Sequence, residues 1–154
     1  LTGLYNRRKA MEFLEELSRK ASSGIGFSLC ICDIDFFKKV NDQYGHDIVD
    51  ELLIKISEIF QKEIQKGNFA ARWGGEEFLL IFPSNNGDEA YVEIEEIRRK
   101  IKNLRVQAGD TSFGITMTFG LAEYDFSNGL KATIKEADEK LYNGKEQGRD
   151  RIIF

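Results

Sequence analysis

Apolar residues repeat along this chain with two periods, one typical of helices and one typical of strands. Spacings of three and four residues predict four amphipathic helices, over residues 7–21, 48–64, 90–104 and about 130–143. Asn6 is suited to cap the first helix, and Ser22-Ser23-Gly24 is expected to end it. The charged residues between Glu93 and Lys100 are interpreted as the solvated face of the third helix.

Strand-like segments alternate with these helices. Residues 27–34 are continuously apolar, which predicts a central strand covered on both sides. Large apolar side chains alternate with smaller ones over residues 115–121, which predicts a strand with one strongly apolar face, and residues 151–154 predict a short closing strand. Residues 36–45 are expected to be turn-like. With one hairpin inserted, this alternation predicts an α/β sandwich around a mixed sheet.

The inserted hairpin contains the most informative stretch of the chain. Gly74-Gly75 separates two strand-like segments, residues 69–73 and 76–82, so the glycines are expected to supply the positive φ angles of a tight two-residue turn. Glu76 and Glu77 follow at once and would point to opposite faces of the sheet. Since carboxylates are poor strand formers, the pair indicates a function, and binding of a divalent cation such as Mg²⁺ is the natural candidate.

Composition restricts the class of protein. At 154 residues, the chain is predicted to be a single domain over residues 1–154, and its start without a methionine suggests a piece of a longer protein. The 22 basic and 26 acidic residues give a net charge of −4, which argues against a general nucleic-acid binder or a membrane-surface binder. No apolar run approaches the ~20 residues of a membrane span.

The two cysteines indicate the compartment. Cys30 and Cys32 lie two apart in an apolar strand and are interpreted as small core residues, in preference to a redox pair or half of a metal site. Free buried thiols are typical of a reducing environment, so we expect a cytoplasmic domain. Whether the full-length protein is anchored to a membrane is left open by this sequence.

Two acids are expected to meet across neighbouring strands. Asp33 ends the central strand, and Glu76 opens the second strand of the hairpin. Together they would form a two-carboxylate site for Mg²⁺, with Mn²⁺ as the alternative, of the kind that works with substrate phosphates. One such acid alone is more often an ordinary solvated residue, but the cluster favours the metal site.

Three cations accompany these acids. Lys38 follows Asp33 closely, while Lys145 and Arg149 lie in a glycine-bounded turn near the C-terminus. Cations beside a metal suit a triphosphate, although each one alone is typical of solvated charge. The chain has no glycine-rich Walker loop, so phosphates would not be bound in P-loop fashion.

Polar side chains near the start of the second helix suggest a base-recognition site. Asn41 and Asp50 offer amide and carboxylate groups that could recognise a guanine edge, although Asn41 is also a common turn residue. His46 is the only histidine of the chain, and a structural hydrogen bond in a Gly-His turn is a more common role for it than that of a base.

A set of short motifs follows in order along almost the whole chain. They are Leu1-Thr2-Gly3-Leu4 with Asn6-Arg7-Arg8, Asp33-Ile34-Asp35-Phe36-Phe37-Lys38, Asn41-Asp42 with Gly45-His46, Arg72-Trp73-Gly74-Gly75-Glu76-Glu77-Phe78, Ala137-Asp138 with Leu141-Tyr142, and Lys145 with Gly148-Arg149. Each motif alone is weak, but the ordered set is specific. It resembles the GGDEF family of diguanylate cyclases.

The resemblance implies a three-layer α/β/α sandwich around a mixed, mainly antiparallel sheet, like the palm domains of nucleotide cyclases and polymerases. It also implies that two GTP are condensed into cyclic di-GMP with loss of two pyrophosphates. Because that product has two-fold symmetry, the expected catalytic unit is a homodimer with one GTP in each subunit. An upstream sensory or receiver domain is the expected regulatory partner.

The resemblance also assigns roles residue by residue. Asp33, the Ile34 carbonyl and Glu76 would bind Mg²⁺. Glu77 would assist deprotonation of the attacking ribose 3′-hydroxyl, and Lys38 would neutralise charge in the transition state. The phosphates would be held by the backbone amides of Phe36 and Phe37 and by Lys38, Lys145 and Arg149. Guanine would be recognised by Asn41 and Asp50, with His46 nearby.

Two departures from the family pattern change the expectations. Gln65 and Asn68 occupy the positions of the family's Arg-x-x-Asp product-inhibition motif, so tight feedback binding of product is not expected. Val49 replaces a usual glycine before Asp50 and is expected to add bulk near the base pocket. Two alternatives stay open, a non-catalytic GTP-binding regulatory module and a cyclic di-GMP receptor, and Gln65 and Asn68 argue against the receptor.

Overall fold

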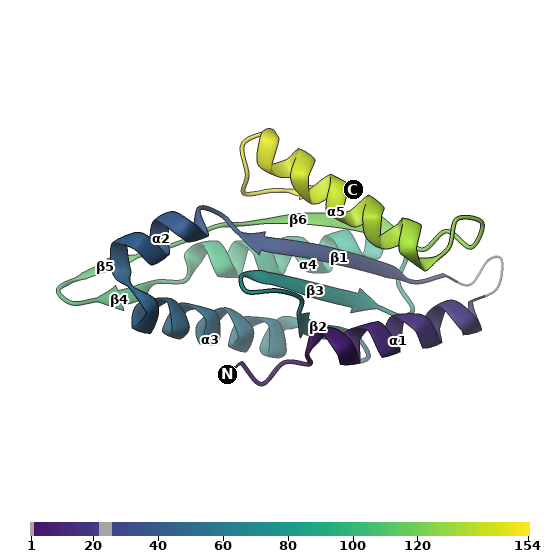
Figure 1. The fold of residues 1–154 in the computed structure, drawn as a ribbon, viewed down its shortest axis with the longest axis horizontal. Helices are drawn as coiled ribbons and strands as arrows, with labels where there is room; N and C mark the ends of the chain where they lie inside the picture. Colours follow the sequence, from purple (N-terminus) through teal and green to yellow (C-terminus); the bar gives the residue numbers. More distant parts are fainter. Residues whose placement is uncertain (1, 22–25) are drawn as a thin grey trace.

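The computed structural model describes residues 2–21 and 26–154, in which a five-stranded sheet lies between two layers of helices (Figure 1). Leu1 and the expected helix end at Ser22-Ser23-Gly24 lie outside the described residues. In chain order the elements are α1 (Arg7–Lys20), β1 (Ser28–Ile34), α2 (Phe37–Tyr44), α3 (His46–Glu63), β2 (Phe69–Arg72), β3 (Glu77–Phe82), α4 (Gly87–Asn103), β4 (Val106–Ala108), β5 (Thr111–Phe113), β6 (Met117–Glu123), α5 (Leu130–Glu146) and β7 (Ile152–Ile153). None of the described helices is both long and apolar enough to cross a membrane.

The main sheet has the order β2-β3-β1-β6-β7. Every neighbouring pair is antiparallel except β6 and β7, which run parallel. All seven residues of β1 are buried, as the continuous apolar run predicts for a central strand. The predicted mixed, mainly antiparallel sheet is therefore confirmed.

Each face of the sheet has its own core. On one face, α3 and α4 contribute Leu52, Ile56, Phe60, Ile94 and Ile97 to a cluster with the inward side chains of the strands. On the other face, α1 and α5 contribute Ala10, Leu14, Ala137 and Leu141. The predicted helical faces are thus the buried ones, and the helices lie in two layers as expected.

One glycine allows α5 to lie directly on the sheet. A Cβ at Gly120 in β6 would come within 2.1 Å of the Ala137 carbonyl oxygen and 2.5 Å of the Leu141 nitrogen. Both contacts are to helix backbone, so a larger residue would push α5 away. This close packing fixes where the C-terminal end of α5, which carries Lys145, meets the end of β1.

One local expectation is wrong, and one hairpin was not predicted from the sequence. Residues 36–45 are not turn-like, because most of them form α2, whose Val40 is buried and whose Tyr44 stacks on Phe113 at 4.0 Å between ring centroids. Phe113 belongs to the β4–β5 hairpin, a second hairpin that the sequence analysis missed because each of its strands has only three residues. Figure 1 shows this hairpin projecting beside α2.

The Gly74-Gly75 turn also differs from the expectation. Neither glycine has a positive φ angle. The chain reverses over residues 73–76 rather than over two residues, and the Glu77 carbonyl accepts hydrogen bonds from the Trp73 nitrogen at 2.9 Å and the Gly74 nitrogen at 3.2 Å. A longer turn does not need left-handed residues. Glu76 therefore lies in the turn, just before β3, and not in the strand itself.

Candidate functional site: a carboxylate edge of the central sheet

Asp33 lies where β1 leaves the core. Its Cα is opposite Glu77 of β3 and Thr118 of β6, and the residue is only 6% exposed. One carboxylate oxygen, Oδ2, accepts an ion-paired hydrogen bond from Lys145 Nζ. The other, Oδ1, is buried and finds no hydrogen-bond partner among the described residues. An unpaired buried carboxylate oxygen is costly, so this atom is suited to a cation or a hydrogen-bond donor.

Glu76 lies beside Asp33, as the sequence predicts. Its carbonyl accepts a hydrogen bond from the Ile34 nitrogen at 3.4 Å, which ties the turn to the end of β1. Burial raises the pKa of Asp33, and the charges of Glu76 and Asp35 raise it further, against the opposing effect of Lys145. The acids are therefore close enough to repel one another.

Glu77 completes the acidic edge. It is half-buried at the start of β3. Burial raises its pKa, with further increases from the charges of Asp33 and of Asp138 on α5. A carboxylate with a raised pKa is a better proton acceptor than a fully solvated one. Asp138 belongs to one of the sequence motifs, but only the fold brings it near enough to Glu77 to affect its pKa.

The donor set at this edge fits a hard divalent cation. Asp33 Oδ1 is unpaired, Glu76 supplies a second carboxylate, and oxygen ligands are the type that Mg²⁺ prefers. Among the described residues, His, Cys, Asp and Glu side chains nowhere gather in a group of three that could hold a metal. A cation here would thus rely on two carboxylates, the Ile34 carbonyl, and oxygens from solvent or substrate.

The predicted cations occupy different positions. Lys145, in the last turn of α5, contacts Asp33 directly. Lys38 does not contact the acidic edge. Its side chain is 91% exposed and pairs with Asp42, one turn along α2, at 3.3 Å. An exposed pair of this kind contributes at most about 1 kcal/mol, so it is a weak restraint on Lys38.

Arg149 is brought to the N-terminus of α2. Its guanidinium carbon lies 4.5 Å from the ring centroid of Phe36, an exposed residue with a left-handed backbone (φ 57°) that precedes α2. The amides of the first helical turn, beginning at Phe37, have no intrahelical acceptor and favour anions. The structure thus brings two of the predicted phosphate-binding features together, the amides at the start of α2 and Arg149.

Asn41, Asp50 and His46 lie along α2 and the first turns of α3. The Asn41 side-chain oxygen is buried, and no group in the described part of the chain donates a hydrogen bond to it. Asp50 and His46 are exposed. Val49 is 4% exposed and belongs to the core cluster under α3. Its side chain therefore packs into the core, so the expected added bulk near the base pocket is not found.

The Gln65–Asn68 segment contacts α4. Glu93 is 5% exposed, and its carboxylate accepts hydrogen bonds from the Gln65 nitrogen and from Asn68 Nδ2, both at 3.0 Å. The interpretation of the Glu93–Lys100 run as simply a solvated face is therefore wrong at Glu93. The buried Glu93 carboxylate places a negative charge beside Gln65 and Asn68, which is unfavourable for an anion at these positions.

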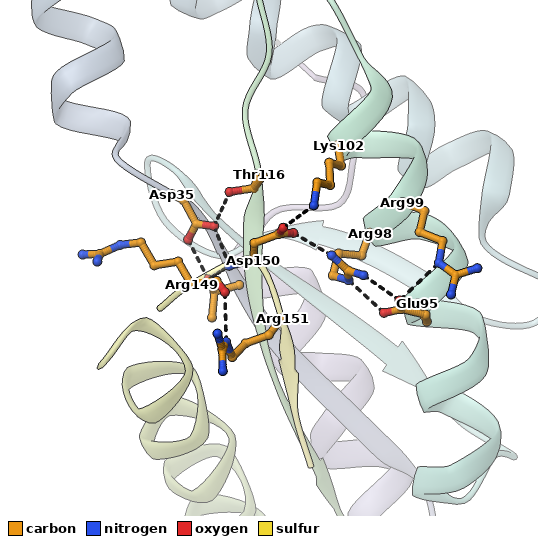
Figure 2. Close-up of polar contacts among 10 residues, drawn as sticks. Asp35, Glu95, Arg98, Arg99, Lys102, Thr116, Arg149, Asp150 and Arg151 are labelled. Atoms are coloured by element: carbon orange, nitrogen blue, oxygen red, sulfur yellow. Dashed lines mark hydrogen bonds and ion pairs between the residues drawn. The ribbon is translucent and has the colours of Figure 1, made fainter. Parts of the chain in front are cut away.

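A polar network behind the acidic edge was missed by the sequence analysis. Asp35, 3% exposed, accepts hydrogen bonds of 2.6 Å from the hydroxyls of Thr116 and Thr118. It also accepts one of 3.0 Å from the Asp150 nitrogen, and the Asp150 carboxylate binds Arg98 (Figure 2). Arg98 and Asp150 are 52 residues apart, so no local pattern could have paired them.

A surface hollow of about 980 Å³ lies away from all of these residues. It is lined by the loop after β3 (Pro83 and Asn85), by Tyr124 and Phe126 after β6, and by Lys140 of α5. None of the residues predicted to act on substrate lines it. The candidate site is thus the open carboxylate edge rather than this hollow.

Comparison with known proteins shows the family to which the chain belongs. The family model described as "Diguanylate cyclase, GGDEF domain" matches residues 1–151. This chain belongs to the GGDEF family. Diguanylate cyclase VdcA of Vibrio cholerae is 37% identical over 156 residues, and diguanylate cyclase DgcP of Pseudomonas aeruginosa is 33% identical over 153 residues. In both comparisons 99% of this chain is aligned, but it spans only 45% of VdcA and 23% of DgcP.

Solved GGDEF structures have the same fold. Diguanylate cyclase SiaD of P. aeruginosa, solved in complex with its activator SiaC, has a TM-score of 0.95 and 36% identity over 99% of this chain and 59% of that one. The GGDEF domain of DgcB from Caulobacter crescentus, in complex with c-di-GMP, has a TM-score of 0.92 and 31% identity over 99% and 89%. The palm-like α/β fold predicted from the motifs is therefore confirmed.

Proposed function

We propose that this GGDEF domain condenses two GTP into cyclic di-GMP and two pyrophosphates, as a homodimer with one GTP in each subunit. The observation that carries the proposal is the unpaired, buried Oδ1 of Asp33, placed beside Glu76 and Glu77 at one edge of the sheet. These acids and the neighbouring cations are the groups that phosphoryl transfer requires.

Mg²⁺, with Mn²⁺ as the alternative, fits the oxygens of Asp33, Glu76 and the Ile34 carbonyl. A divalent cation supplies charge neutralisation for the phosphate oxygens. Lys145 already offsets part of the charge of Asp33, and its ammonium group can also pair with a phosphate oxygen bound at this edge. Arg149 and the first amides of α2 bind the remaining phosphate oxygens.

In each half-reaction, the 3′-oxygen of one GTP forms a bond to the α-phosphorus of the other. The bond from that phosphorus to the oxygen of the β-phosphate breaks, and pyrophosphate leaves. Glu77 takes the hydroxyl proton, for which its raised pKa is suited. Lys38 turns from its exposed partner Asp42 to the triphosphate, at little cost because that pair is weak.

Guanine recognition uses the unpaired oxygen of Asn41 together with Asp50. The Asn41 oxygen accepts a hydrogen bond from a guanine N–H, which removes the cost of leaving it buried and unpaired. Asp50, exposed one helix later, accepts from the remaining edge donors. Adenine presents a different donor pattern there, so GTP is the favoured nucleotide over ATP.

The decisive experiment incubates a dimeric form of the protein with GTP and Mg²⁺ and measures both pyrophosphate and cyclic dinucleotide. Replacement of Glu77 by Gln keeps the size of the side chain but removes the proton acceptor. We expect kcat to fall by about 10²–10⁴-fold, the usual contribution of a positioned base.

Glu58→Gln is the matched control, because Glu58 is exposed on α3, and it should leave turnover unchanged. A Glu77→Gln variant with full activity would remove the assigned role. GTP binding without either product, in an unaltered dimer, would instead support a non-catalytic regulatory module.

A further inference from the structure

The turn that presents Arg149 has an unusual backbone. Gly148, Arg149 and Asp150 are three consecutive residues with positive φ angles, of 118°, 64° and 48°. Glycine tolerates this region, but each of the other two residues costs roughly 1–2 kcal/mol there. Such a conformation persists only when surrounding contacts hold it, so the contacts of this turn decide where Arg149 lies.

The backbone of the turn is held from the sheet side. The Asp150 nitrogen donates to Asp35 Oδ2 at 3.0 Å and to the Thr118 hydroxyl at 3.1 Å. The Arg149 nitrogen donates to the Gly144 carbonyl at 2.9 Å, which closes the turn onto the end of α5. These bonds explain why Asp150 adopts a left-handed conformation, but they do not involve its side chain.

The side chain of Asp150 is held from the other side by α4. Arg98 Nη1 binds Asp150 Oδ1 at 2.6 Å, and Lys102 Nζ binds Oδ2 at 2.7 Å. Arg98 is itself oriented by Glu95, through hydrogen bonds of 2.6 and 2.8 Å, and its side chain is 15% exposed. Burial alone would raise the pKa of Asp150, but the hydrogen bonds and charges of Lys102 and Arg98 together lower it.

Arg149 points the opposite way. Figure 2 shows its side chain extending away from the Asp150 carboxylate and from the α4 cations. Its guanidinium instead lies over Phe36, at the entrance to α2. One turn therefore has two sides, with Asp150 fixed to α4 on one and Arg149 directed toward the proposed phosphate site on the other.

We propose that Asp150 is a positioning residue that, held by Arg98 and Lys102, fixes Arg149 over Phe36 for binding the triphosphate. None of these three side chains needs to touch the nucleotide. The inference rests on the proposed function in one respect, since it takes Arg149 to bind phosphate. It assigns to α4, which carries none of the predicted substrate-binding residues, control over the affinity for GTP.

The test is a double-mutant cycle between Arg98→Ala and Arg149→Ala, with binding of α,β-methylene-GTP in the presence of Mg²⁺ as the first readout. This analogue lacks the bond that the reaction breaks, so affinity is measured without turnover. We expect each single variant to weaken binding by about tenfold, and the double variant to be no weaker than Arg149→Ala alone. With GTP, KM should rise while kcat changes less.

Arg99→Ala is the matched control, since Arg99 lies on the same helix, is 70% exposed and pairs only with Glu95 among the described residues. It should bind the analogue normally. Lys102→Ala, which removes an exposed side chain, should weaken binding several-fold, and only when Arg149 is present. Arg98→Lys should bind the analogue more tightly than Arg98→Ala, because lysine keeps the positive charge although it lacks the paired N–H donors of the guanidinium.

The proposal would be overturned if the losses of affinity in Arg98→Ala and Arg149→Ala multiplied in the double variant, because the two residues would then act independently. It would also be overturned if both Arg98→Ala and Lys102→Ala bound the analogue as the unaltered protein does. If the double variant binds the analogue as expected but the protein forms no cyclic dinucleotide, only the proposed catalytic function is refuted. If the protein forms cyclic dinucleotide but the effects of Arg98→Ala and Arg149→Ala on binding are independent, only the positioning role is refuted.

Discussion

At the level of single residues, folding and function place opposite demands on Asp33. The side chain is almost fully buried, one oxygen lacks a partner, and acids of the same charge lie close by. Lys145 offsets this only in part, because the net effect still raises the pKa of Asp33. A residue that is unfavourable when charged, yet sits where a cation fits, is what a metal site requires.

Replacement of Asp33 by Asn should therefore stabilise the folded protein at neutral pH. A carboxyl whose pKa is raised by folding favours the folded state below its ordinary pKa, and this contribution is lost as the pH rises through the raised pKa. Asn removes the ionisation, so the urea midpoint without Mg²⁺ should be higher than that of the unaltered protein at pH 7. The difference should shrink toward pH 4, and cyclase activity should be lost.

The control for this variant is Asp110→Asn, in the exposed turn between β4 and β5, which should change neither midpoint nor activity. A lower midpoint for Asp33→Asn at pH 7 would mean that the contact with Lys145 outweighs the burial and repulsion. In that case the ionised Asp33 side chain would not destabilise the fold as proposed.

At the level of elements, the spacing of apolar residues predicts which faces of the helices and strands are buried. The four long helices and the central strand bury the faces that their apolar spacing indicates. The failures have local causes. The eight-residue helix α2 depends on Val40 and Tyr44 meeting distant residues, and the three-residue strands β4 and β5 are too short to show a period. The turn at Gly74-Gly75 is longer than the two residues expected, because the residue types in a turn do not determine the hydrogen-bond register of the strands beside it.

The charged face of α4 differs most from its interpretation in the sequence analysis, which took it to be simply solvated. Its polar residues are not equivalent, since Glu93 faces the Gln65–Asn68 segment, and Arg98 and Lys102 face Asp150. A charge run in a sequence shows a polar face but not which of its members will be covered by another segment. That depends on contacts between residues 25 to 52 positions apart.

Glu93→Ala should destabilise the fold by about 1–3 kcal/mol, because it leaves the Gln65 nitrogen and Asn68 Nδ2 without their acceptor. Urea unfolding measures this directly. Glu96→Ala, an exposed glutamate on the same helix, should stay within about 0.5 kcal/mol of the unaltered protein. Equal midpoints for Glu93→Ala and Glu96→Ala would show that the buried carboxylate does not hold the segment to α4.

At the level of the whole molecule, the candidate site is built from segments that the sequence orders but does not place. The motifs identified Asp33, Glu76, Glu77, Lys145 and Arg149, and the fold brings them to one end of the sheet. Asp35 belongs to one of these motifs, but its contacts, and those of Arg98 and Asp150, could not be predicted because the partners come from other elements. The side-chain direction of Lys38 also needed the structure, in which Lys38 is exposed and pairs with Asp42.

This single edge is half of the proposed catalytic unit, and that makes activity depend on concentration. One chain supplies one set of acids and one guanine-recognition pair, whereas the reaction joins two nucleotides symmetrically. At concentrations where sedimentation shows mostly monomers, a tenfold dilution should lower the activity per mole of protein about tenfold, because the dimer fraction falls in proportion. Fusion to a parallel dimeric coiled coil should remove this dependence and raise activity at low concentration. Constant activity per mole on dilution of the unfused protein through that range would show that one chain suffices, and the proposed pairing of two half-sites would be wrong.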